Sequence, residues 1–178
     1  MTVEEGRHDL FVLTGGLRLD GRDLATGAYV AMDGGSDLTA GEAGATLFHF
    51  RKRHAGPASR TIVNPGNRVW RTGIIPGVRR CDLRVSDHEV ALVTFDPATR
   101  IRPHRHHRGE EIYVLAGALH GAPMRLGPGE WHRLDPHAIH APRAMEATMI
   151  LLLTGHLSSE GFGARSTHPP TPRDPDPL

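Results

Sequence analysis

The stretch that decides the fold of this chain is Ile101-Arg-Pro-His-Arg-His-His-Arg-Gly-Glu-Glu-Ile-Tyr-Val-Leu-Ala-Gly117. His104 and His106 stand two residues apart, so on an extended strand both imidazoles project from the same face. A turn containing Gly109 follows, and Glu110 then opens a second apolar strand that runs back along the first. If the two strands pair as a hairpin, two imidazoles and one carboxylate converge on one point.

Neutral imidazole and carboxylate groups are ligands for Zn, Fe, Ni, Cu or Mn, and three of them leave positions open for water or a substrate. His140, which a proline follows two residues later, is the candidate for a fourth ligand from elsewhere in the chain. The sequence therefore predicts a metal site made of His104, His106, Glu110 and His140. Three alternatives remain open. The first two histidines could lie on the surface of an arginine-rich loop, His140 could be a core histidine, and a β-bulge could put Glu111 in the place of Glu110.

Composition indicates an all-β protein. Gly (21 residues) and Pro (14 residues) are spread among short apolar runs, and long windows with helical periodicity are missing. At 178 residues the chain is long enough for one domain with a real core, or for one and a half small ones. Ala144 to Leu153 is the most apolar run and is expected to form a central strand.

Charge and cysteine content exclude several classes of function. The formal net charge of +1 gives no electrostatic footprint for nucleic acid or an anionic membrane, so neither partner is expected. The single cysteine, Cys81, excludes an intrachain disulfide and is expected to be a small buried residue. No apolar run approaches the roughly 18–20 residues of a membrane helix, and the first residues carry no hydrophobic signal segment. We therefore expect a cytoplasmic location.

The chain contains an internal repeat with an offset of 102 residues. Residues 8–50 align without gaps with residues 110–152, and nine of the 43 pairs are identical, against about three for unrelated sequences of ordinary composition. The identical pairs include Gly15 with Gly117 and Gly27 with Gly129. Shared turn-forming residues could also produce such matches, but a duplicated module explains them better. The positions that correspond to the four metal ligands hold Thr2, Glu4, His8 and Leu38, so the first copy has lost any ligand set.

The repeat sets the expected domain organisation. Residues 1–50 form a degenerate half-repeat kept for packing, and residues 51–67 form a connecting segment. The whole stretch from Arg51 to Arg80 is expected to have little regular structure. The metal-binding barrel occupies residues 68–155, and the proline-rich tail, residues 156–178, is expected to be disordered. The arginines between residues 51 and 80 are expected on the solvated surface.

Other polar and aromatic residues have plainer interpretations. His107, His132 and His137 are expected on the surface or next to the site rather than as ligands. Tyr113 and Trp131 are expected in the core. Glu111, Tyr113 and Leu115 would face outward from the barrel, which suggests that its outer face is covered by the first repeat or by another subunit.

The pattern Pro-His-x-His-x-x-x-Glu, then Gly-Pro-Gly, then Pro-x-x-x-His, resembles the two sequence boxes of the cupin superfamily. The segment Pro103 to Gly117, together with His140-Ala-Pro-Arg143, is similar to the ChrR-like cupin branch. The resemblance covers residues 68–153 well and residues 8–50 as a decayed repeat. It implies a jelly-roll barrel that holds one divalent metal ion, of Fe, Mn, Ni or Zn, at the positions of His104, His106, Glu110 and His140.

The same resemblance suggests a function. Relatives of this branch include oxygenases that cleave small dicarbonyl, enol or phenolic compounds, so an Fe(II)-type dioxygenase with a small-molecule substrate is the first hypothesis. A metal-dependent lyase or isomerase is the enzymatic alternative, and a non-enzymatic metal-dependent sensor or ligand-binding regulator is the other. Inhibition of a sigma factor is poorly supported, because it requires a helical zinc-binding half. No catalytic acid or base can be named, and a homodimer is expected.

Overall fold

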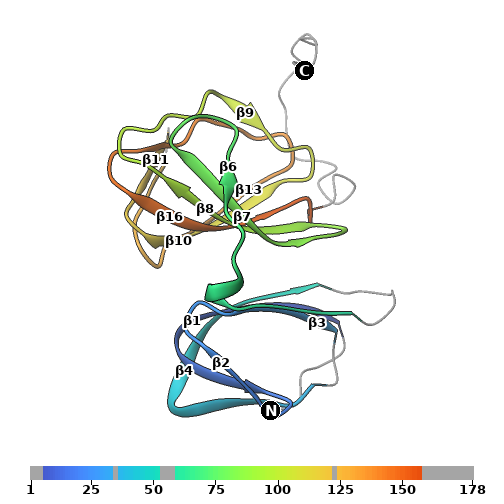
Figure 1. Cartoon of the computed structure of the whole chain (residues 1–178). Coiled ribbons are helices and arrows are strands. Elements are labelled where there is room, and N and C mark those ends of the chain that lie inside the picture. The colour runs from blue at the N-terminus through green and yellow to red at the C-terminus, as the bar shows by residue number, and fades with distance from the viewer. Residues whose placement is uncertain (1–5, 34–35, 53–58, 122–123, 158–178) are drawn as a thin grey trace.

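The computed structural model describes residues 6–33, 36–52, 59–121 and 124–157, and within them the only helix is one 3-10 turn, η1 (Pro65–Asn67). Two curled β units follow one another along the chain, the first below the second in Figure 1. The first contains β1 (Arg7–Leu19), β2 (Arg22–Ala25), β3 (Tyr29–Asp33), β4 (Leu38–Lys52) and β5 (Arg60–Val63). The second contains β6 (Arg71–Thr72), β7 (Val78–Val85), β8 (Glu89–Phe95), β9 (His104–Arg105), β10 (Glu110–Ala116), β11 (Leu119–Gly121), β12 (Met124–Leu126), β13 (Trp131–Leu134), β14 (Ile139–His140), β15 (Arg143–Ala144) and β16 (Thr148–Thr154).

The first unit is organised around β1. One edge of β1 pairs antiparallel with β3 and then with β2, while the other edge pairs with β4 along almost its whole length. Alternate residues of these strands enclose a core of their own, which includes Leu10, Val12, Leu19, Val30 and Met32. The curl of the sheet thus buries apolar side chains that a flat five-stranded sheet would expose.

The second unit is a barrel built around a six-stranded sheet with the order β13-β10-β16-β8-β7-β6. β16 lies between β10 and β8, in the centre of this sheet, as its apolar sequence predicts. Two small sheets, β12-β11-β15 and β14-β9, face it. The interior between them is lined by apolar side chains of the inward-facing positions, among them Val93, Phe95, Ile112, Leu119 and Ile150.

The predicted repeat is a structural repeat. Leu17 pairs with Leu24 in the first unit, and Leu119 pairs with Leu126 in the second, each 102 residues further along. The same backbone hydrogen bond closes the corresponding turn in both copies: Gly27 N–H donates to Val12 O at 2.7 Å, and Gly129 N–H to Val114 O at 2.8 Å. The degenerate half-repeat and the all-β jelly-roll class are thereby confirmed.

The backbone requires glycine at Gly117 and at the matching position of the first copy, Gly15. Gly117 has φ +71°, a region that favours glycine, and a Cβ there would lie 2.3 Å from Ala147 O. We expect Gly117→Ala to lower the free energy of unfolding by about 2 kcal/mol or more, since the left-handed backbone alone costs about 1–2 kcal/mol. Gly66→Ala is the control, because a Cβ at Gly66 would meet no atom within 4 Å and the φ of Gly66 is not positive. Urea denaturation of both variants would contradict this account if they lost equal stability.

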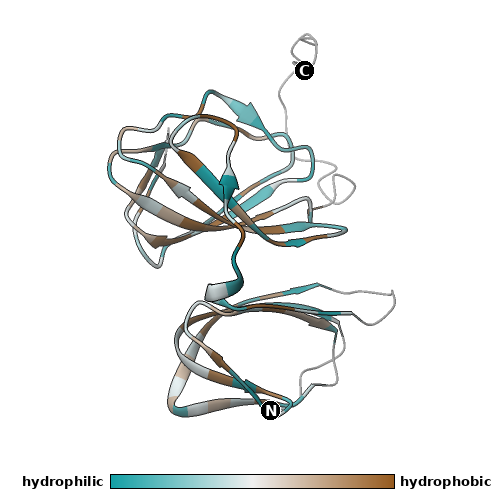
Figure 2. Ribbon diagram, viewed as in Figure 1, coloured by the Kyte–Doolittle hydropathy of each residue, from teal (hydrophilic) through white to brown (hydrophobic). Residues whose placement is uncertain are grey.

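The outer face of the barrel packs on the first unit. A shared apolar cluster joins Phe11 and Tyr29 of the first unit to Leu92 and Leu151 of the second. Tyr113 contributes to this cluster and lies against Phe48, with ring centroids 5.2 Å apart. Figure 2 shows apolar strand segments on both sides of the junction. Of the two expected covers for the outer face of the barrel, the first repeat or another subunit, the structure shows the first repeat.

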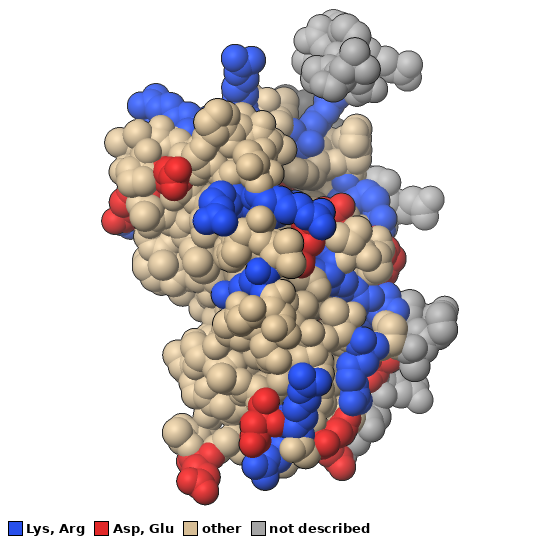
Figure 3. Space-filling model, viewed as in Figure 1, with Lys and Arg blue, Asp and Glu red and all other residues tan. Residues whose placement is uncertain are grey.

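Ion pairs close the edge of this junction. Asp87, in the β7–β8 turn, accepts hydrogen bonds from Arg7 Nη1 at 2.9 Å and from Lys52 Nζ at 3.0 Å, both in the first unit. Arg7 also contacts Asp33 at 3.3 Å and is itself 6% exposed. On the face shown in Figure 3, acidic and basic side chains are interspersed, and several basic side chains lie near the junction.

Asp87 makes the stability of the protein depend on acid pH. Partial burial raises the pKa of Asp87, but the hydrogen bonds from Lys52 and Ser86 and the nearby charge of His88 outweigh burial and hold the pKa well below its usual range. A carboxylate with a lowered pKa stabilises the folded state above its unfolded pKa of about 3.9 and loses that contribution as the pH falls further. We expect Asp87→Asn to flatten the decline of stability below about pH 4.5, and the exposed Asp135→Asn to leave it unchanged. Urea midpoints measured from pH 7 to pH 3 test this, and parallel curves for wild type and Asp87→Asn would contradict it.

Several expectations about segments need correction. The range 51–67 is not without regular structure: β5 pairs with β3, because β3 has a free edge there, and η1 follows it. His156 and Leu157, expected in the tail, pack on the barrel, and Leu157 N–H donates to Arg108 O at 3.1 Å. The remainder of the expected tail, residues 158–178, lies outside the described residues. The described part of the chain holds no helix with the length and hydrophobicity needed to cross a bilayer.

Candidate metal centre

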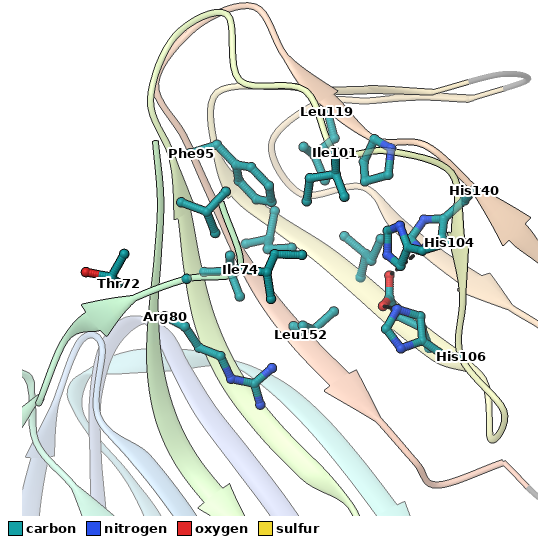
Figure 4. Close-up of a pocket in the computed structure, with 17 residues that line it drawn as sticks. Thr72, Ile74, Arg80, Phe95, Ile101, His104, His106, Leu119, His140 and Leu152 are labelled. Atoms are coloured by element: carbon teal, nitrogen blue, oxygen red, sulfur yellow. Dashed lines mark ion pairs between the residues drawn. The ribbon is translucent and has the colours of Figure 1, made fainter. Parts of the chain in front are cut away.

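The four predicted ligands meet at one end of the barrel. One donor atom from each of His104, His106, Glu110 and His140 lies within 4.8 Å of every other, which is the spread expected for ligands around one ion. Figure 4 shows the three imidazoles gathered around the carboxylate on one side of the cavity.

The strand pairing that brings them together differs from the predicted hairpin. β9, which carries His104, does not pair with β10, because both edges of β10 are already occupied by β13 and β16. β9 pairs instead with β14, in the register that sets His104 directly opposite His140. The fourth ligand, distant in sequence, is therefore the cross-strand neighbour of the first.

A tight turn connects His106 to Glu110, the first residue of β10. Gly109 N–H donates to His106 O at 3.2 Å, and His137 N–H donates to the same oxygen at 2.9 Å. Gly109 has φ +65°, and a Cβ there would lie 2.4 Å from Leu157 Cδ1, so only glycine fits this position. The turn thus fixes His106 relative to Glu110.

The carboxylate comes from Glu110 and not from Glu111. Glu110 is 3% exposed and shares the inward face of β10 with Ile112. Glu111 points to the outer face, where it accepts hydrogen bonds from Trp131 Nε1 and His156 Nε2, each at 3.0 Å. A bulge in β10 does occur, but it lies between Val114 and Ala116, beyond both glutamates, and leaves their faces unchanged.

The donor atoms have the properties of metal ligands. His106 Nε2 lies 2.7 Å from Glu110 Oε2, yet the two atoms are not aligned for a hydrogen bond, and both ring nitrogens of His140 are buried without a hydrogen-bond partner among the described residues. Buried polar atoms without partners are costly, and a shared cation would satisfy them together. His104 Nδ1 lies 2.9 Å from Arg102 O and donates to it, which leaves Nε2 as the free lone pair.

The protonation states also fit. Burial lowers the pKa of His140 to about 4, and the positive charges of neighbouring histidines add to this against the opposing charge of Glu110. His140 is therefore neutral near pH 7 and can offer a lone pair. Contact with the Glu110 carboxylate raises the pKa of His106 against the lowering effect of burial, so a metal ion competes with a proton for this imidazole.

The remaining histidines near the site, Cys81 and Trp131 do not belong to the ligand group. His107 and His137 are exposed and contact each other, with ring centroids 5.1 Å apart. His132 lies beside Ile112 in the pairing of β10 with β13, near enough for its charge to lower the pKa of His140, but it does not line the cavity. Cys81 is buried, as predicted, whereas Trp131 is 49% exposed and is not a core residue.

A cavity of about 390 Å³ extends from the metal ligands into the barrel. Its volume is at the small end of the range of about 300–1,000 Å³ that is typical of ligand pockets. Most of its wall is apolar and comes from Ile101, between β8 and β9, and from inward-facing strand residues: Val78, Val93, Phe95, Ile112, Leu119, Ile150 and Leu152. The arrangement thus combines a metal-binding end with an apolar chamber for a small ligand.

Residues 58–160 match the family model of the ChrR cupin-like domain, which is more than half of the chain. The chain belongs to the ChrR cupin-like family. No curated protein gives a significant match to it.

Solved structures with the same architecture support this ChrR-like cupin fold. A candidate glyoxylate-induced protein from Pseudomonas aeruginosa superposes with a TM-score of 0.72 at 17% identity, over 86% of this chain and 67% of that one. A candidate dioxygenase from Nostoc punctiforme gives 0.69 at 14% identity, over 86% and 64%. AerE from Microcystis aeruginosa gives 0.68 at 12% identity, over 86% and 81%. At these identities the likeness establishes the fold, and it includes both units of this cupin.

Proposed function

We propose that this cupin is a metal-dependent enzyme, a dioxygenase of the non-haem Fe(II) type that acts on a small dicarbonyl, enol or phenolic compound. The proposal rests on one observation: three histidines and one carboxylate lie together in the wall of an apolar cavity of about 390 Å³. Three imidazoles and one carboxylate are suitable ligands for Fe, Mn, Ni or Zn and leave room for an exogenous ligand. When bound, Fe(II) supplies the one-electron chemistry that allows an organic substrate to react with dioxygen.

The residues of the chain supply the other requirements. The carboxylate of Glu110, 4% exposed in its side chain, compensates the charge of a divalent ion inside an apolar barrel. The hydrogen bond from His104 to Arg102 O holds the imidazole in one tautomer and one orientation. The mostly apolar wall would limit the water near the metal, which protects reactive species from side reactions.

Metal analysis and oxygen uptake together test this proposal. Protein purified without added metal should contain close to one Fe, Mn or Ni per chain, and the Fe(II) form should consume oxygen with some members of a panel of β-diketones and hydroxyaryl ketones. Bound zinc, with no oxygen uptake by the Fe(II)-reconstituted protein, would refute the dioxygenase and favour a ligand-binding sensor. Turnover of the panel without oxygen uptake would favour a lyase or an isomerase.

The homodimer remains a prediction, and its interface would have to lie outside the junction between the two units. The first unit of the same chain covers the outer face of the barrel, so a dimer contact has to use another face. Light scattering coupled to size-exclusion chromatography measures the oligomeric state directly.

A further inference from the structure

One charged side chain other than the metal ligands lines the cavity. Arg80 projects inward from β7, on the face that also carries Val78, and lines the same cavity as His106 and Glu110. Figure 4 shows its side chain extending below Leu152 into the space opposite the metal ligands. The expectation that the arginines of residues 51–80 lie on the solvated surface is therefore wrong for Arg80.

Two carboxylates hold this guanidinium in one orientation. Arg80 Nε donates to Asp82 Oδ1 and Nη2 donates to Glu89 Oε2, both at 2.6 Å. These bonds use two of the five N–H donors of the guanidinium. The described residues provide no hydrogen-bond partner for Nη1, so the outer edge of the fork, with one N–H from each terminal nitrogen, remains available to a ligand in the cavity.

The charges around Arg80 permit an anion to approach. Arg71 Nη1 lies 4.0 Å from Asp82 Oδ2, so two arginines balance the two carboxylates of this cluster. The side chains of Asp82 and Glu89 are 31% and 45% exposed, so water and salt weaken the field of these two carboxylates. A guanidinium held rigidly by its neighbours binds a planar carboxylate with two parallel hydrogen bonds and a small entropic cost.

We infer that the cavity takes a small organic acid, whose carboxylate pairs with Arg80 and whose apolar body lies against the barrel wall. The inference rests on the proposed function in one respect: the opposite end of such a ligand would reach the metal centre as a substrate. It narrows the substrate class from neutral or anionic dicarbonyl, enol and phenolic compounds to those that carry a carboxylate. Arg80 is then the residue that determines specificity.

The test compares benzoate with benzamide, a neutral ligand of nearly the same shape, and with the cation benzamidine. Calorimetric titration of the zinc-loaded protein should show benzoate binding at least tenfold more tightly than benzamide. Arg80→Met should reduce this ratio below about threefold, and Arg80→Lys, which keeps the charge but not the fork, should give an intermediate ratio. Arg79→Met, on the same strand but facing outward near Trp70, is the control and should keep the wild-type ratio.

Three results would overturn the inference: no binding of benzoate to wild type, an unchanged benzoate-to-benzamide ratio in Arg80→Met, or tighter binding of benzamidine than of benzoate. Thermal denaturation and zinc content of each variant show whether the fold is retained. The same titrations on metal-free protein separate this inference from the proposed function. If the protein binds zinc but its preference for benzoate over benzamide does not depend on Arg80, only the acid-binding role of Arg80 is refuted. If that preference depends on Arg80 but the protein does not bind metal, only the metal-dependent function is refuted.

Discussion

Glu110→Ala is expected to reduce the affinity of the protein for a divalent metal by more than 100-fold. Glu110 lies within reach of two other ligands, with Oε2 2.7 Å from His106 Nε2 and Oε1 3.7 Å from His140 Nε2. It supplies the only carboxylate in the ligand group that the described residues form. Losing residues that merely orient ligands costs about 10–100-fold in metal affinity, so losing a charged ligand should cost more. Zinc competition against a chromophoric chelator at pH 7.5 measures the effect.

Glu111→Gln is the matched control for this experiment. Glu111 is the next residue, is 7% exposed, and points to the opposite face of β10. It should keep wild-type zinc affinity, although its loss of charge beside His156 can lower stability. Equal affinity of Glu110→Ala and wild type would show that the four side chains do not share an ion. An equal loss in both variants would show that the glutamate pair acts through the fold and not through coordination.

The convergence of His104, His106 and Glu110 could be predicted because it depends on local spacing. His140 lies far away in the sequence and could be singled out only by the prolines near it. The two-residue interval between His104 and His106 and the four residues to Glu110 limit where these side chains can lie, whatever strand they pair with. The internal repeat was readable for a similar reason. Its turns require glycine at positions such as Gly15 and Gly117, with φ +74° and +71°, and that requirement preserves identities in a chain that has otherwise diverged.

Strand pairing and the inward direction of Arg80 could not be predicted. The partner of β9 depends on which edges are already occupied, and that is a property of the assembled sheet. Arg80 reads as one more charge in a basic segment, since an inward arginine becomes plausible only when Asp82 and Glu89 are known to bind it. The burial of β8 also depends on the assembled fold, because one of its faces packs inside the barrel and the other against the first unit.

Asp9→Ala is expected to lower the free energy of unfolding by about 3–5 kcal/mol, the range measured when one partner of a buried ion pair is removed. Asp9 is 3% exposed at the junction of the two units, where its Oδ2 lies 2.9 Å from His88 Nε2 and its Oδ1 3.7 Å from Arg84 Nη1. Tyr29 also donates its hydroxyl to Asp9, and burial raises the pKa of this phenol, so it remains a donor. Removing the carboxylate leaves three buried polar groups without their common partner.

Asp23→Ala separates this effect from the general loss of an ion pair. Asp23 pairs with Arg18 at 2.7 Å in the same unit, but the two side chains are 75% and 57% exposed, so its removal should leave the stability close to that of wild type. Urea denaturation at pH 7 with two probes, tryptophan fluorescence and circular dichroism, gives both values. A loss below about 1 kcal/mol in Asp9→Ala would mean that the apolar cluster alone holds the units together, because the buried carboxylate would then contribute no more than an exposed one. Non-coincident transitions in the variant, with a single transition in wild type, would show that Asp9 couples the unfolding of the two units.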